Sequence, residues 1–123
     1  MGAAATAVMG RRIELTRDIV ERFPDLTQVE WRRGGLLPRI AAFPLGESTV
    51  SAVTLWGTVW LSEDAPLSDE LLLHELRHVH QFQSGIAFPF QYLWEFLRHG
   101  YEANRFEVDA RAYAAARLRD IRR

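Results

Sequence analysis

The pattern of hydrophobic and polar residues predicts a helix near the start of the chain, followed by a short strand. Apolar side chains fall on one side at helical spacing over residues 11–23, and Pro24 ends this predicted helix. Residues 26–31 alternate weakly between apolar and polar, which indicates a strand before the turn at Gly34 and Gly35.

The middle of the chain is expected to be mostly extended. Residues 36–46 contain Pro38 and Pro44, which is typical of an edge strand or a loop. Residues 50–61 are rich in β-branched and aromatic side chains, and Gly57 in their midst indicates either a bulge or a tight hairpin. This part of the chain therefore predicts a small antiparallel or mixed sheet.

The second half of the chain predicts three helices. Ser68 is a suitable N-cap for a helix that runs to about residue 83 and stops at Gly85. An aromatic helix is expected over residues 90 to about 99, and a last helix over residues 104 to about 121. A helix, several strands and then three helices form an α+β arrangement.

Length and composition narrow the class of protein. A chain of 123 residues is expected to form a single domain over residues 1–123, with residues 1–10 flexible. The net charge of −1 argues against a nucleic-acid or anionic-membrane binder. The chain shows neither the residue order of a secretory signal nor a run of about 20 apolar residues, so the cytoplasm is the expected compartment.

The chain contains no Cys, which excludes disulfides, thiolate catalysis and cysteine-based metal clusters. Any metal must therefore be held by His, Asp or Glu. All four histidines fall between residues 74 and 99, in the first two of the three predicted helices. This window is where a metal site is expected.

The window contains an H-E-x-x-H motif, His74-Glu75-Leu76-Arg77-His78. Residues four apart lie on the same face of a helix, so the two imidazoles can converge on one ion. Glu75 is rotated by about 100° from His74. It is therefore better placed to accept a proton from a water than to join the same ligand set.

Two interpretations of this motif compete. In the first, His74 and His78 are surface residues beside a solvated Glu75. In the second, the helix is buried, because it carries apolar residues on most of its sides (Leu71, Leu72, Leu73, Leu76, Val79 and Phe82). Buried His and Glu side chains need partners, and a metal would supply one. The metal interpretation is favoured.

A zinc site needs a third protein ligand and an open fourth position. The downstream candidates are His80, His99, Glu102, Glu107 and Asp109. Glu107 is favoured over Asp109 because it shares a face of the last helix with alanines and other apolar residues that should pack inward. The alternative role for Glu107 is a capping box with Asn104.

Two segments together carry a resemblance to a known family. The run from Leu72 to Gln81 looks like the active-site helix of zincin metallopeptidases, and the run from Tyr101 to Ala110 resembles the glutamate helix of gluzincins. The short length is similar to that of the minigluzincins. The likeness covers roughly residues 50–121, and it implies a minimal zincin-like fold with an active-site helix and a C-terminal glutamate helix.

The resemblance implies a zinc metallopeptidase that acts on a peptide or protein substrate. His74, His78 and Glu107 would then be the zinc ligands, with Glu75 as the general base. Asp109 falls where such helices often have an acidic residue that orients a liganding His. Gln81 matches a polar position that is common after the motif, and the sequence assigns it no role. The resemblance also implies that the strand within residues 53–61 forms the upper rim of a substrate cleft.

Other features keep several questions open. The oxyanion donor is one of Tyr101, His99 and Tyr113. The aromatic residues between Phe88 and Phe96 are expected to be core and not a ligand box. The rival functions are a zincin-like module that binds metal and a protein without useful turnover, and a structural domain without metal. Another divalent ion also suits a His, His and carboxylate set. Neither the oligomeric state nor the physiological substrate follows from these residues.

Overall fold

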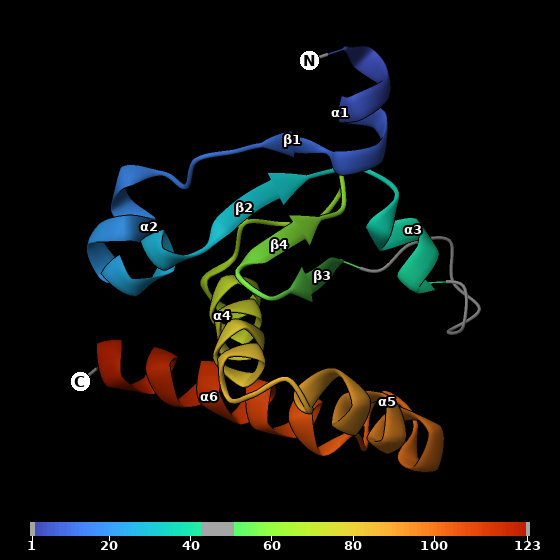
Figure 1. Ribbon diagram of the computed structural model, residues 1–123. Coiled ribbons are helices and arrows are strands. Elements are labelled where there is room, and N and C mark those ends of the chain that lie inside the picture. Colours follow the sequence, from blue (N-terminus) through green and yellow to red (C-terminus); the bar gives the residue numbers. More distant parts are fainter. Residues whose placement is uncertain (1, 43–50, 123) are drawn as a thin grey trace. The chain divides into compact units, whose positions relative to one another are not determined.

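The fold is α+β, as the hydrophobic pattern predicts, in a computed structural model that describes residues 2–42 and 51–122 (Figure 1). The chain forms two compact units, Met1–Pro66 and Leu67–Arg123. The first unit contains a small sheet with short helices, and the second is helical in its described residues. The residues of the H-E-x-x-H motif and Glu107 all belong to the second unit.

The first unit is organised around a four-stranded mixed sheet in the order β1-β2-β4-β3. These strands are β1 (Arg11–Arg12), β2 (Glu30–Arg33), β3 (Ala52–Leu55) and β4 (Thr58–Leu61). The inner strands β2 and β4 run parallel, with Trp31 opposite Val59, whereas both outer pairs are antiparallel. The inner strands supply buried hydrophobic side chains to the core of this unit, among them Trp31, Val59 and Leu61.

The predicted helix over residues 11–23 is wrong in its first half. Residues 11 and 12 form β1, and the amide of Ile13 still donates to the carbonyl of Trp31 at 2.9 Å. The helix α2 begins only at Arg17 (Arg17–Arg22). Pairing with β2 gives these backbone groups partners that helical periodicity in the sequence does not reveal.

Three further elements differ from the expectation. The helix α1 (Ala3–Met9) lies within residues 1–10, which are predicted to be flexible. The flexibility of this segment stays a prediction. A 3₁₀ helix, η1 (Pro24–Gln28), takes the first part of the predicted strand over 26–31. The helix α3 (Leu37–Ala42) replaces part of the predicted extended segment over residues 36–46. Pro38 fits in its first turn because an N–H there has no helical partner; residues 43–46 lie outside the described residues.

The strands β3 and β4 form a tight hairpin. Of the two structures predicted from Gly57, a bulge or a hairpin, the hairpin is therefore confirmed. Leu55 pairs with Thr58, so Trp56 and Gly57 make a two-residue turn. Trp56 has a φ of 53°. The left-handed region is unfavourable for a residue with a Cβ, and a bulky side chain there is uncommon.

The second unit consists of the three helices that the sequence predicts, with small changes at their ends. These are α4 (Asp69–Gln83), α5 (Phe88–His99) and α6 (Arg105–Ile121). The Ser68 hydroxyl caps α4 by accepting from the amide of Leu71, and the Asn104 side chain caps α6 by accepting from the amide of Phe106. The helices α4 and α6 pack against each other, and α5 begins two residues earlier than expected.

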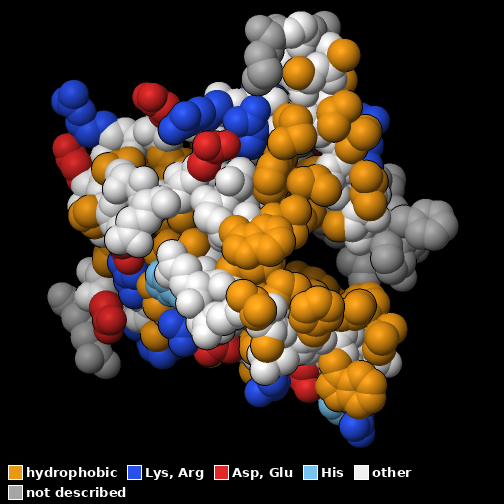
Figure 2. All heavy atoms as spheres, in the orientation of Figure 1, with side chains coloured by type: hydrophobic (Ala, Val, Ile, Leu, Met, Phe, Trp, Pro, Cys, Tyr) orange, Lys and Arg blue, Asp and Glu red, His pale blue; other side chains and the backbone are white. Residues whose placement is uncertain are grey.

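The expectation that the aromatic residues of α5 are core is only partly correct. Phe88 is buried, with its ring against the rings of Phe82 and Phe106. Phe90 and Trp94, by contrast, are 75% and 59% exposed. Figure 2 shows hydrophobic side chains gathered over α5. The helix is therefore apolar on two opposite faces, and among the described residues the face that carries Phe88 is buried whereas the face of Phe90 and Trp94 is exposed.

A helix that crosses a bilayer needs about 20 predominantly apolar residues. Among the residues that the structure describes, none of the helices combines the length and the apolar character of a membrane span.

The turn at Trp56 generates a prediction about stability. Asn tolerates the left-handed region better than Ala does, so Trp56→Asn should be more stable than Trp56→Ala by about 0.5–1 kcal/mol. Because both variants remove the indole, the comparison isolates the backbone preference. Urea denaturation of the two variants measures the difference. Equal midpoints would show that the turn relaxes to another conformation.

Candidate metal centre

The helix α4 places His74 and His78 one turn apart on the same face. The centroids of their rings lie 4.9 Å apart, and only 14% and 9% of their side-chain surfaces are exposed. The helix is held in place by residues that are fully buried, among them Leu72, Leu73 and Leu76. The sequence's prediction of a buried helix is therefore confirmed, and the interpretation of both histidines as solvated surface residues is wrong.

The helix α6 brings Glu107 to the two histidines. One carboxylate oxygen, Oε1, lies 2.9 Å from Nε2 of His74 and 3.1 Å from Nε2 of His78. The other oxygen, Oε2, accepts a hydrogen bond from the Tyr92 hydroxyl at 2.6 Å. Glu107 itself is 3% exposed. One buried carboxylate thus meets side chains from both of the other helices in this unit.

The capping role proposed for Glu107 is not what the contacts support. The amide of Asn104, which a capping box would satisfy, donates instead to the carbonyl of Tyr101 at 3.3 Å. The first turn of α6 is capped by two other side chains: Asn104 accepts from the amide of Phe106, and Glu95 accepts from the amide of Arg105. The Glu107 carboxylate is therefore directed into the histidine pair.

The three side chains have the chemistry and spacing of a metal site. Within the described residues, His74, His78 and Glu107 each offer one ligand atom, and these atoms lie within 4.8 Å of one another. Ligand atoms about 2.1 Å from a tetrahedral ion lie about 3.4 Å apart. The observed N–O distances of 2.9 and 3.1 Å are shorter than that value, and no two of the three ligand atoms lie more than 4.8 Å apart, so an ion would require moderate adjustments of the three side chains. This buried His, His and Glu group could therefore hold a metal ion.

The electrostatics of the cluster follow from its burial. Burial opposes a charge on the His78 ring, but the hydrogen bond to Glu107 and the negative charges of Glu75 and Glu107 outweigh it and raise the His78 pKa to about 9. Burial likewise disfavours the charged Glu107, yet the hydrogen bonds from His74, His78 and Tyr92 hold its pKa well below its ordinary value. Without a metal, a positive His78 and a negative Glu107 therefore stabilise each other.

Glu75 lies close to this cluster. It is 6% exposed, and its negative charge contributes to the raised pKa values of His78, Tyr92 and Tyr101. Glu75 therefore lies within electrostatic range of groups on α4, on α5 and after α5. The side chain predicted to be a base is thus part of the same buried region.

Tyr101 is the candidate oxyanion donor that the structure brings nearest to the cluster. Tyr101 is itself 37% exposed, and its partial burial together with the charges of Glu107 and Glu75 raises its pKa, so its hydroxyl stays protonated in the ordinary pH range. Of the other candidates, His99 is exposed in the last turn of α5. Tyr113 accepts a hydrogen bond from Arg117 and lies under Arg77.

Among the described side chains, Asp109 makes hydrogen bonds with Arg77 and Gln81 close to the site but with neither His74 nor His78. Its carboxylate accepts two hydrogen bonds from Arg77, at 2.7 and 3.3 Å, and one from Gln81 at 2.9 Å. It is Gln81 whose side chain reaches the ring of His78, at 2.7 Å from Nδ1. The sequence missed this role, although the spacing of three residues from His78 on one helix could have indicated it.

Tyr92 is the second functional residue that sequence reasoning missed. The sequence groups it with the core aromatics, and its ring does lie against those of Phe88 and Phe106. Its hydroxyl nevertheless reaches Glu107, and burial together with the Glu107 charge raises its pKa. A Tyr among core aromatics has a polar end that needs a partner, and this was the available signal.

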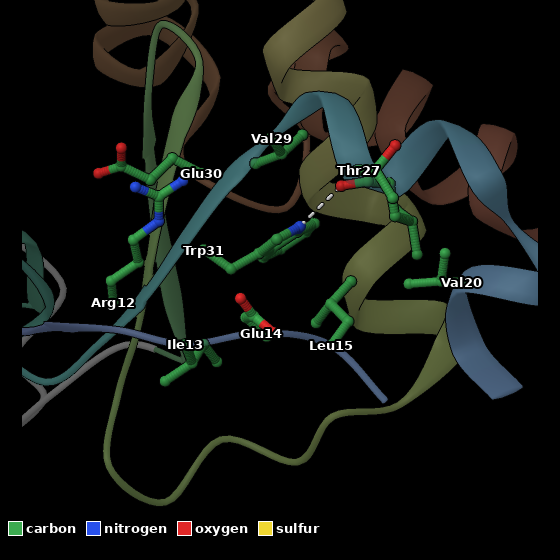
Figure 3. Close-up of a pocket in the computed structure, with 10 residues that line it drawn as sticks. Arg12, Ile13, Glu14, Leu15, Val20, Thr27, Val29, Glu30 and Trp31 are labelled. Atoms are coloured by element: carbon green, nitrogen blue, oxygen red, sulfur yellow. Dashed lines mark hydrogen bonds between the residues drawn. The ribbon is translucent and has the colours of Figure 1, made fainter. Parts of the chain in front are cut away.

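A cavity of about 280 Å³ lies elsewhere, in the first unit (Figure 3). Its lining comes from β1 and the segment that follows it, from α2, from η1 and from β2, with Trp31 in the middle of the view. The indole of Trp31 is already bonded to the carbonyl of Leu26 at 2.9 Å. None of the predicted site residues lines this cavity.

The geometry predicts how two carboxylates should differ in metal binding. Glu107→Ala removes a ligand and should weaken the binding of a divalent ion at least a hundredfold. Asp109→Ala removes a group that acts through Gln81, and should weaken binding about tenfold or less. Titration of metal-free protein with Co²⁺ or Zn²⁺ gives both affinities. The reverse ranking would assign the third ligand to Asp109.

Comparison with known proteins adds no relative to this picture. No protein-family model, no curated protein and no solved structure matches the chain. The resemblance to zincins therefore rests on the two sequence segments that contain His74, His78 and Glu107.

Proposed function

We propose that this protein is a zinc-dependent peptidase of the gluzincin type. The observation that carries the proposal is the convergence of His74, His78 and Glu107 within 4.8 Å beside a buried Glu75. Two imidazoles and one carboxylate are the ligand set of several zinc hydrolases, which keep a further position open for water. The ligands come from two packed helices, so the site is built on rigid elements.

In this proposal, zinc supplies a Lewis acid that lowers the pKa of a water molecule and polarises the substrate carbonyl. The chain supplies the proton transfers. Glu75 takes the proton that the attacking water loses as its oxygen bonds to the carbonyl carbon. It then gives this proton to the amine nitrogen as the carbon–nitrogen bond breaks. Tyr101 donates a hydrogen bond to the carbonyl oxygen as negative charge develops there.

The proposed roles separate Glu75 from the ligands. Glu75→Gln keeps the size of the side chain but removes the base, so peptide hydrolysis should fall by at least a thousandfold. Zinc content, measured by elemental analysis, should stay near one equivalent per chain. The matched control is Glu70→Gln, which lies in the first turn of the same helix and should be fully active.

Two outcomes would contradict the proposal in different ways. A wild-type protein that retains zinc but hydrolyses no peptide in a broad substrate library would support the rival module that binds metal without turnover. Hydrolysis that survives Glu75→Gln would remove the assignment of the general base.

The raised pKa of His78 predicts an unusual pH dependence of zinc binding. A metal ligand must be neutral, but at pH 7 a ring with a pKa of about 9 is protonated. Zinc must therefore displace one proton, and its apparent affinity should rise about tenfold per pH unit from pH 7 to about 9. An ordinary histidine would give a plateau above about pH 6.5. Calorimetry in buffers of different ionisation enthalpy measures the proton released, and no release at pH 7 would contradict the electrostatic picture.

A further inference from the structure

Gln81 connects the candidate metal centre to an ion pair on its far side. Its carbonyl oxygen Oε1 lies 2.7 Å from Nδ1 of His78. Its amide nitrogen donates one hydrogen bond to the carbonyl of Phe106 at 3.0 Å, and another to Oδ2 of Asp109 at 2.9 Å. These contacts use the amide oxygen and both of its N–H groups.

The surroundings fix the orientation of the Gln81 amide. The groups on its nitrogen side, a backbone carbonyl and a carboxylate, are both acceptors. If the amide were turned over, its oxygen would face two acceptors and its nitrogen would face the ring of His78. The oxygen therefore faces Nδ1, and this ring nitrogen must carry a hydrogen. That leaves Nε2, the atom next to Glu107, as the nitrogen that can bind a metal.

The Arg77–Asp109 ion pair supports the Gln81 amide on its nitrogen side. Asp109 accepts two hydrogen bonds from Arg77, and the Arg77 guanidinium lies over the ring of Tyr113 at 5.0 Å. Arg77 and Gln81 are one turn apart on α4, and Asp109 faces both from α6. A side chain at position 81 must accept on one side and donate on the other, and an amide does both.

We propose that Gln81 is a positioning residue that links His78 to the Arg77–Asp109 pair and presents Nε2 of His78 to the metal. The part of this inference that concerns the metal rests on the proposed function. The orientation of the ring concerns the metal-free protein as well. Gln81 and His78 are both buried, so loss of the amide leaves polar groups without partners in the interior.

The first test uses a variant of similar shape that makes no hydrogen bonds. Gln81→Met should weaken the affinity for Zn²⁺ by 10- to 100-fold. The Nδ1 proton of His78, slowly exchanging in nitrogen-15 NMR spectra of the metal-free wild type, should exchange rapidly in this variant. Gln83→Met, at an exposed position of the same helix, is the matched control and should change neither quantity. A Gln81→Met protein with unchanged affinity and a protected proton would overturn the proposal.

A second test moves the negative charge from position 109 to position 81. It remains decisive if Gln81→Met is unstable. Gln81→Glu replaces the donating amide nitrogen with an acceptor oxygen, which would face the Asp109 carboxylate and the Phe106 carbonyl. This substitution should therefore weaken Zn²⁺ binding. Adding Asp109→Asn provides a donor again and should restore part of the loss. If the second substitution instead weakens binding further, the proposed link is wrong. If the wild type binds no Zn²⁺ but keeps the protected Nδ1 proton, the proposed function fails while the positioning of His78 stands.

Discussion

In the second unit, the hydrogen bonds of the buried Glu107 carboxylate join all three helices. A carboxylate with 3% of its surface exposed needs hydrogen-bond donors, and among the described residues His74, His78 and Tyr92 supply them. These donors lie on α4 and α5, whereas Glu107 lies on α6. The same contacts that satisfy the charge therefore bring all three helices of the unit together at one point.

Such a cluster is a poor way to gain stability alone. Charges removed from water lose solvation, and well-packed hydrophobic residues in their place are often equally stabilising or better. Perturbed pKa values in a buried group of ligating residues are, however, typical of functional sites. The raised pKa of His78 and the lowered pKa of Glu107 reflect mutual stabilisation that a metal would replace. A buried His, His and Glu group of this kind could hold a metal ion.

The cluster is supported from two sides by different kinds of contact. On one side, Tyr92 fixes one oxygen of Glu107 and leaves the other for the histidines. On the other, Gln81 and the Arg77–Asp109 pair hold the ring of His78. The helix α5 has a second apolar face that is exposed and takes no part in this support. Most contacts of the site therefore come from α4 and α6, and α5 adds the Tyr92 hydroxyl.

The sequence by itself determined the local features of this protein. The order of helical and extended patterns along the chain predicted the α+β class correctly. The cap at Ser68, the burial of α4 and the spacing of His74 and His78 were also predicted, because these patterns depend on residues within about one helical turn of one another. The sequence was wrong about residues 11–16, where pairing with a strand some twenty residues away outweighs helical periodicity.

Only the tertiary structure decided which partners meet across helices. The choice of Glu107 as a histidine partner in place of a cap, the hydroxyl of Tyr92 and the link through Gln81 to Asp109 all join side chains at least 15 residues apart. The pattern along a helix predicts which face is buried. It does not predict what that face will meet, because the meeting depends on how two helices pack.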